Sequence, residues 1–115
     1  MDTARDPEEH FVPVADQVDL DRLFTESAEQ PVVLFKHDFS CHISANAYRE
    51  LAAVPVEVPL IDVGRQQELA DEVAIRTGIE HESPQVIVLR NGQPVYTASL
   101  WHISGKEVAR AAGGA

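Results

Sequence analysis

The sequence predicts an α/β domain in which helices flank a four-stranded mixed β-sheet. Helix-like segments alternate with two apolar, strand-like runs through the first two thirds of the chain. Two further strand-like runs flank Asn91-Gly92, a dipeptide that favours tight β-hairpin turns. A strand–helix–strand unit forms a parallel pair by a right-handed crossover, whereas a hairpin adds antiparallel strands. Alternation followed by a hairpin therefore indicates a mixed sheet with helices on both faces.

Length, charge and cysteine count limit the possible functions. A chain of 115 residues fits a single domain, which we expect to span residues 1–115. Nineteen acidic and nine basic side chains give a formal charge of −10, so no nucleic-acid partner is expected. No apolar run approaches the roughly 18 residues of a membrane span, and the N-terminus lacks signal-peptide character. We expect a cytoplasmic protein with no membrane partner and, with one cysteine, no internal disulfide.

The first elements expected are a lead-in and an extra N-terminal helix. Residues 1–13 carry charges and two prolines without periodicity, which indicates an extended lead-in. Asp19 is suited to cap the helix, because Val18 and Leu23 have the spacing of a hydrophobic staple. The helix is expected to end near residues 29–31.

A strand, a helix and a second strand follow. Residues 31–35 are mostly β-branched or aromatic, and their continuous apolarity predicts a strand covered on both faces. A polar turn then leads into a helix over residues 41–53, which carries an apolar stripe. The second strand is expected over residues 56–63, where Pro59 indicates a sheet edge or a bulge.

A third helix and the hairpin come next. The helix is expected over residues 65–77, and Gly78 is placed at its end, where a left-handed conformation costs glycine little. The hairpin strands are expected over residues 86–89 and 95–98.

The last element expected is a short helix. Ser104 is suited to cap it, and the tail over residues 113–115 is expected to fray. The complete order, α-β-α-β-α-β-β-α, is that of a thioredoxin-like fold with its extra N-terminal helix.

The junction between the first strand and the second helix carries the only thiol. Residues 35–44 read Phe-Lys-His-Asp-Phe-Ser-Cys-His-Ile-Ser. Cys41 stands where the helix begins, and unpaired backbone N–H groups together with the helix dipole favour a thiolate there. Ser44 stands where a dithiol oxidoreductase has its second cysteine; its hydroxyl can donate to the sulfur but cannot replace a thiol. Cys41 and Ser44 are therefore the candidate catalytic residues of a monothiol exchange site, which an external thiol must resolve.

The predicted topology brings further residues to the same edge of the sheet. Parallel strands end together, which places Lys36 and His37 near the end of the second strand. The third strand begins at this edge with Ser83-Pro84, and the fourth ends there close to Trp101. These residues are candidates for substrate binding.

Cationic side chains at this edge suit an anionic substrate. Lys36, His37 and His42 can favour a thiolate or attract the carboxylates of a small thiol, and Arg65 is a weaker candidate for the same task. For each of them a solvated surface position is the alternative. Trp101 is a candidate contact whose alternative is ordinary packing at the rim.

These motifs resemble the YtxJ-type family of thioredoxin-like monothiol bacilliredoxins. The likeness runs from about residue 19 to residue 108, and it is carried by residues 35–44, by Glu-Ser-Pro-Gln at 82–85 and by Ser-Leu-Trp at 99–101. The family usually has proline after the cysteine. This chain has His42 there, a departure that bears on thiol acidity and on substrate preference.

The resemblance implies a cytoplasmic thiol–disulfide oxidoreductase that removes bacillithiol from protein mixed disulfides. It implies bacillithiol as a co-substrate, no bound cofactor, and S-thiolated client proteins and a low-molecular-weight thiol as partners. It also implies a cis peptide bond before Pro84, which would pack against the sulfur while the backbone at Ser83 pairs with an extended substrate. Bacillithiol carries a malate group, which suits a cationic rim.

Other functions are compatible with the same fold. A redox-inactive binding or adaptor module would keep Cys41 as an accidental thiol and use the rim near Trp101 for a partner. An iron–sulfur carrier of the monothiol glutaredoxin kind would need a dimer and small thiols as ligands, and it usually has glycine where this chain has His42. No metal site is expected, because Cys41 and His42 are adjacent and no cluster of ligands completes a set.

Overall fold

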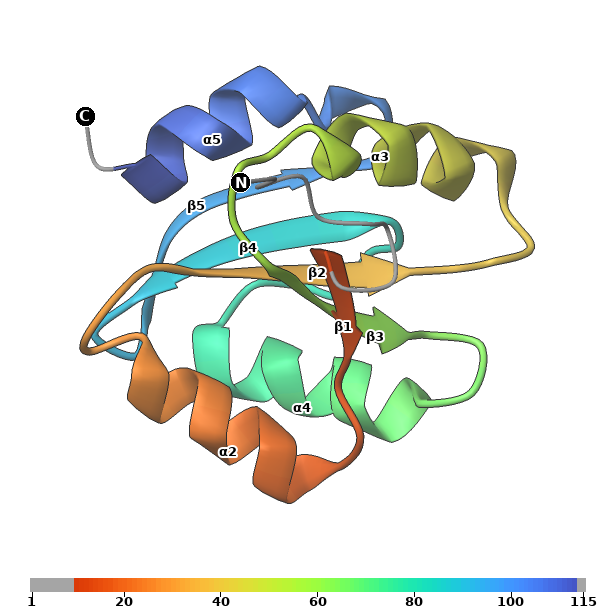
Figure 1. Ribbon diagram of the computed structural model, residues 1–115. Coiled ribbons are helices and arrows are strands. Elements are labelled where there is room, and N and C mark those ends of the chain that lie inside the picture. The colour runs from red at the N-terminus through yellow and green to blue at the C-terminus, as the bar shows by residue number, and fades with distance from the viewer. Residues whose placement is uncertain (1–9, 114–115) are drawn as a thin grey trace.

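The computed structural model describes residues 10–113, which form a five-stranded mixed sheet with helices on both faces (Figure 1). The strand order is β1-β3-β2-β4-β5; β3 is parallel to β1 and β2, and β4 is antiparallel to β2 and β5. The strands are β1 (Phe11–Pro13), β2 (Val32–His37), β3 (Val58–Asp62), β4 (Gln85–Arg90) and β5 (Gln93–Ser99). The helices are α2 (Gln17–Glu26), α3 (His42–Ala52), α4 (Gln67–Thr77) and α5 (Gly105–Gly113), with a 3₁₀ turn η1 (Leu100–His102). The predicted α/β class, with a mixed sheet and flanking helices, is confirmed.

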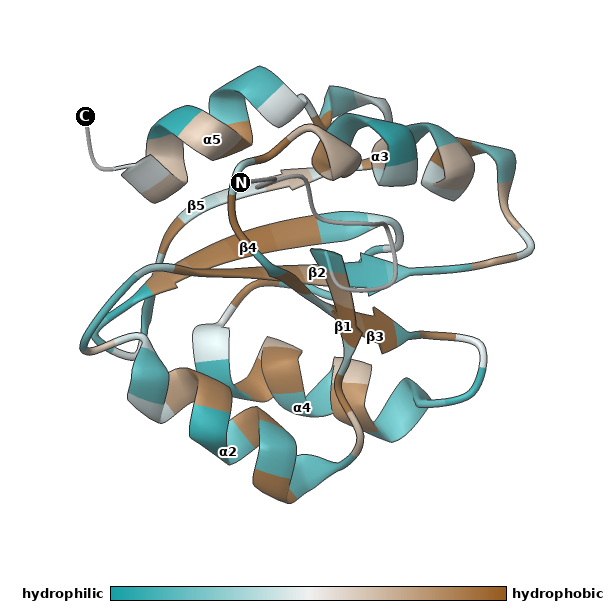
Figure 2. Cartoon of the chain, viewed as in Figure 1, coloured by the Kyte–Doolittle hydropathy of each residue, from teal (hydrophilic) through white to brown (hydrophobic). Residues whose placement is uncertain are grey.

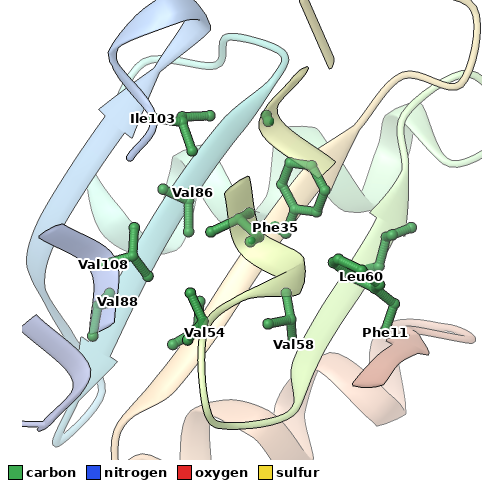
Figure 3. Close-up of a cluster of buried hydrophobic side chains, with 12 residues drawn as sticks. Phe11, Phe35, Val54, Val58, Leu60, Val86, Val88, Ile103 and Val108 are labelled. Atoms are coloured by element: carbon green, nitrogen blue, oxygen red, sulfur yellow. The ribbon is translucent and has the colours of Figure 1, made fainter. Parts of the chain in front are cut away.

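The two faces of the sheet have separate hydrophobic cores. Helices α3 and α5 cover one face and α2 and α4 cover the other, and hydrophobic residues concentrate between the layers (Figures 1 and 2). Strand β2 supplies both cores, with Val33 and Phe35 on the α3 side and Val32 and Leu34 on the α2 side. Figure 3 shows Phe35 at the centre of the first core. This two-sided burial is the physical reason for the unbroken apolar run in the sequence.

Two helix caps and one turn that were predicted from local sequence are confirmed. Gly78 caps α4 with φ of 75°, in the left-handed region. Asn91 and Gly92 have φ of 53° and 73°, and two successive positive values are the signature of a type I′ hairpin turn. Ser104 caps α5, with its Oγ accepting the Glu107 backbone N–H at 3.3 Å.

A fifth strand replaces part of the predicted lead-in, so the expected count of four strands is wrong. Phe11–Pro13 form β1, which pairs in parallel with β3. The Phe11 ring is buried and stacks on Tyr48, with 4.0 Å between ring centroids. A three-residue strand is too short to show periodicity, and long-range burial of one aromatic ring stabilises it. Residues 1–9 of the lead-in lie outside the described part of the chain.

The predictions for Pro59 and for the first helix cap also need correction. Strand β3 lies inside the sheet, but its pairing with β2 begins only at Leu60, so Pro59 breaks none of that ladder. Helix α2 is capped by Asp16, whose carboxylate accepts the Asp19 N–H at 2.9 Å. Asp19 in turn accepts the Ala15 N–H, a hydrogen bond that is the main reason for the lowered pKa of Asp19.

At the C-terminal end, α5 includes Gly113, the first residue of the tail expected to fray, and residues 114–115 lie outside the described range. Within residues 10–113, every helix is too short or too polar to span a bilayer.

Candidate active site

Cys41 is the N-cap residue of α3 and has an extended backbone, with φ of −113° and ψ of 130°. Its N–H donates to the Asp38 carbonyl at 3.1 Å, and its own carbonyl accepts the Ala45 N–H at 3.0 Å. The side chain is partly exposed and caps no backbone N–H. The backbone is therefore fixed from both sides, while the sulfur stays open to a reaction partner at the helix N-terminus that the sequence predicts.

The loop before Cys41 is shaped by Asp38. Its carboxylate accepts the backbone N–H of Ser40 at 3.0 Å and the Ser40 hydroxyl at 2.7 Å. These hydrogen bonds, the hydroxyl first, hold the pKa of Asp38 below its usual range. The turn is a local Asx-type structure, so its geometry follows from the residues at 38 and 40.

Ser44 lies one helical turn after Cys41 and is completely buried. Its Oγ accepts the Asp38 N–H at 2.9 Å and forms a 2.7 Å hydrogen bond with His37 Nδ1. Within residues 10–113, no hydrogen bond joins Ser44 to Cys41. The hydroxyl therefore ties α3 to the reactive loop and to the end of β2, a contact that the sequence does not predict.

Replacing Ser44 with alanine is expected to lower the free energy of unfolding by about 1–3 kcal/mol, because the buried His37 ring and the half-buried Asp38 N–H lose their hydrogen-bond partner. Urea unfolding measures the change. Ser40→Ala, at an exposed position of the same loop, is the matched control and should lose less. Equal stability of Ser44→Ala and the unmodified protein would contradict this structural role.

His37 is buried rather than placed at the rim as a cation. Its ring lies among Phe35, Phe39 and Tyr48, with ring centroids 5.1, 4.2 and 5.2 Å away. Burial lowers the pKa of His37, although the charge of Asp62 opposes this effect. A buried imidazole of lowered pKa is neutral near pH 7, so the predicted attraction of carboxylates by His37 needs correction.

Lys36 is also buried, and it lies on the opposite face of the sheet from α3. Successive strand residues point to opposite faces of the sheet. Lys36 therefore points to the α4 side, as Leu34 does, and His37 points to the α3 side, as Phe35 does. The Lys36 ammonium lies 3.0 Å from His81 Nδ1. Burial lowers the pKa of Lys36 from 10.5 to about 8, against the attraction of Asp71 and Glu82. Lys36 was predicted to be a cation at the rim, but it is buried and contacts the loop over residues 78–84.

Gln85 anchors the same loop from the adjacent strand. It pairs with Lys36 across β2 and β4, and its amide donates to the Glu80 carbonyl at 3.0 Å and to Ser99 Oγ at 3.2 Å. Its Oε1 is buried without a partner within the described residues. Gln85 and His81 were missed as members of the site, because each meets Lys36 through a contact between residues that are far apart in the sequence.

The buried lysine predicts a pH dependence of stability. Since the pKa of Lys36 is lower in the folded state, the unfolded chain binds more protons between about pH 8 and 10.5, and folding becomes more favourable as pH rises through this range. Lys36→Met should lack this increase. Urea unfolding of both proteins at pH 7 and pH 10 gives the difference, and an identical pH response in the two would contradict the burial of a charged lysine.

The predicted substrate-binding residues Ser83, Pro84 and Trp101 belong to the loop before β4 and to η1. The Ser83–Pro84 peptide bond is cis, and the Pro84 carbonyl accepts the Leu100 N–H at 2.9 Å. Leu100 has φ of 58°, a conformation that is rare for a branched side chain and typical of functional segments. Trp101 follows in η1, which packs against α3, and it is 63% exposed.

His42 is exposed at the start of α3, beside Cys41. Arg65 lines a different cleft, of about 580 Å³, between the N-terminal ends of α2 and α4, so it does not join His42. Within residues 10–113, no three histidine, cysteine or acidic side chains gather in a way that could hold a metal ion.

Comparisons with known proteins agree with this geometry. Residues 12–108 match the family described as monothiol bacilliredoxin BrxC. A solved structure described as a candidate oxidoreductase with a thioredoxin fold is 25% identical, with a TM-score of 0.83 over 91% of this chain and 96% of that one. Thioredoxin from Fasciola hepatica is 19% identical, with a TM-score of 0.67 over 89% of this chain and 96% of that one. A mutant thioredoxin from Halobacterium salinarum is 17% identical, with a TM-score of 0.67 over 97% of this chain and 95% of that one.

The two thioredoxins show the fold alone, whereas the family match covers most of the chain and includes the site. A single thiol on this fold agrees with a thiol redox role. The chain belongs to the monothiol bacilliredoxin family.

Proposed function

We propose that this protein removes bacillithiol, or a similar low-molecular-weight thiol, from cytoplasmic proteins that carry it as a mixed disulfide. The Cys41 thiolate attacks the sulfur of the small thiol, and the old disulfide breaks as the new one forms. The client cysteine leaves as a thiolate and takes a proton from water. The small thiol is then held on Cys41.

One observation carries this proposal: the only thiol is open at the start of α3, while the position of a second thiol holds a buried serine. Ser44 is fully buried and engaged with His37 and Asp38, so no internal group can displace the small thiol. Resolution therefore needs an external thiol, which attacks the mixed disulfide, restores Cys41 and leaves with the small thiol as a new disulfide.

The surroundings of Cys41 support docking of a protein substrate. Phe39, Leu100 and Trp101 are exposed apolar side chains from the reactive loop and η1. Within residues 10–113, the backbone N–H and C=O of Ser83 make no hydrogen bond, so they are available to pair with an extended client segment. An exposed apolar surface with free backbone groups suits a segment that is bound briefly and released.

The stoichiometry of the reaction tests this proposal. Without an external thiol, each chain should free about one client cysteine and then stop; adding a small thiol should allow many turnovers. Release of client thiols is followed with a chromogenic thiol reagent after the client has been separated from this protein and from small molecules, because Cys41 loses one thiol for each that the client gains. Continued turnover without an external thiol would overturn the monothiol mechanism, and no release at all would overturn the activity.

A further inference from the structure

A shallow cleft of about 290 Å³ opens beside α3 and is lined by His37, Phe39, Ala45, Tyr48 and Arg49. It begins one helical turn from the reactive residue, because Ala45 donates its N–H to the Cys41 carbonyl. The cleft lies on the side of α3 that faces β1, where Tyr48 stacks on Phe11. A group attached to the sulfur can therefore lie along α3 in this cleft.

The walls of the cleft are mainly aromatic. Phe39 is 66% exposed and meets the His37 ring edge-on at 4.2 Å between centroids, and Tyr48 lies behind them. Aromatic walls with a few polar groups are typical of small-molecule sites, and they suit the apolar face of a ring.

The far end of the cleft carries a positive charge. Arg49 is exposed and forms no ion pair within residues 10–113. Two nearby acidic groups are engaged elsewhere, since Glu50 accepts the Gly105 N–H at 2.9 Å and Asp38 accepts from Ser40. Three other arginines, Arg22, Arg76 and Arg110, form ion pairs with carboxylates, whereas Arg65 and Arg90 resemble Arg49 in forming none within residues 10–113. An unpaired guanidinium is a good partner for a carboxylate, which the protein's charge of −10 otherwise repels.

The separation of Cys41 and Arg49 along α3 fits a ligand that is linked to the Cys41 sulfur. Eight residues separate Cys41 and Arg49, which corresponds to about 12 Å along a helix. Helical side chains lean toward the helix N-terminus, which is the end of α3 that carries Cys41. Consider a thiol built, in this order, from a cysteinyl group, a sugar ring and a terminal dicarboxylate. Its cysteinyl group would lie at the sulfur of Cys41, its ring at the aromatic walls and its dicarboxylate at the guanidinium.

We propose that this cleft binds the small thiol while it is carried on Cys41, with a ring against Phe39 and Tyr48 and a carboxylate on Arg49. The inference rests on the proposed function and adds to it where the small thiol lies and which side chains hold it. It assigns to Arg49 the recognition of the anion.

Thiolation of Cys41 by two disulfides tests the cleft. With the disulfide of bacillithiol, Arg49→Gln should react about three- to tenfold more slowly than the unmodified protein, because one charged contact is lost. With uncharged 2-hydroxyethyl disulfide the two should react equally. Added salt should reduce the difference between the two proteins with bacillithiol disulfide, because it screens the contact of Arg49 with the carboxylate. Arg90→Gln, at the opposite end of the sheet, is the control and should match the unmodified protein.

The outcomes separate the cleft from the function. If the unmodified protein forms no adduct with bacillithiol disulfide, the proposed function fails. If it forms the adduct and Arg49→Gln reacts at the same rate, only the cleft proposal is overturned. An equal slowing with both disulfides would also overturn it, since the change would then act on the thiol itself.

Discussion

Replacing Cys41 with serine is expected to abolish the removal of bacillithiol from a client protein. The variant lacks the only thiol of the chain, and a serine hydroxyl does not take part in thiol–disulfide exchange. The loss should be complete rather than partial, because within residues 10–113 the loop has no other sulfur nucleophile. Release of client thiols over time, with an external thiol present and after subtraction of the rate with that thiol alone, measures the effect.

The fold of Cys41→Ser should be retained, which makes the loss interpretable. The cysteine side chain is partly exposed and caps no backbone N–H, so the change of sulfur to oxygen disturbs no packed contact. Urea unfolding should give a midpoint close to that of the unmodified protein. Removal of bacillithiol by a folded Cys41→Ser variant would show that the proposed nucleophile is wrong.

Replacing Gly105 with alanine is expected to destabilise the protein by about 1–3 kcal/mol or more, as overpacked sites do. Gly105 is buried at the start of α5, and a Cβ built there would clash with the Glu50 carbonyl oxygen. The Glu50 side chain also accepts the Gly105 N–H at 2.9 Å, so α3 and α5 meet without room for a methyl group. Urea or thermal unfolding measures the loss.

Gly113→Ala is the matched control in the same helix. A Cβ at Gly113 meets nothing within 4 Å, and alanine favours a helix more than glycine does. This variant should be as stable as the unmodified protein or slightly more so. Equal stability of Gly105→Ala would mean that the α3–α5 contact is looser than described, and with it the support of the helix that carries Cys41.

The sequence predicts the elements whose signals are local. Two-sided burial makes β2 an apolar run, and Asn91-Gly92 adopts the positive φ angles that a type I′ turn requires. Strand β1 could not be predicted, because three residues show no period and the burial of Phe11 depends on Tyr48, far along the chain.

The site was predicted in part. Cys41 lies at the start of α3, and Ser83-Pro84 and Trp101 lie at the end of the sheet or in the turn that packs on α3. Lys36 and His37 were assigned to the rim because the first strand was expected to end at residue 35, at the edge of the sheet. The structure buries both, since β2 continues through His37 and hydrogen bonds with His81 and Ser44 offset the cost of burial. Extending the alternation of the strand by two residues would have placed them on opposite faces.

The monothiol transfer is tested most directly by the mass of the intact protein after a single turnover. Reduced protein is mixed with an equal amount of a bacillithiol-modified client, without an external thiol, and the reaction is stopped with acid. We expect one bacillithiol to be added to Cys41 and the client to lose it. A stable disulfide between Cys41 and the client, or an unchanged mass of both proteins, would contradict the proposed transfer.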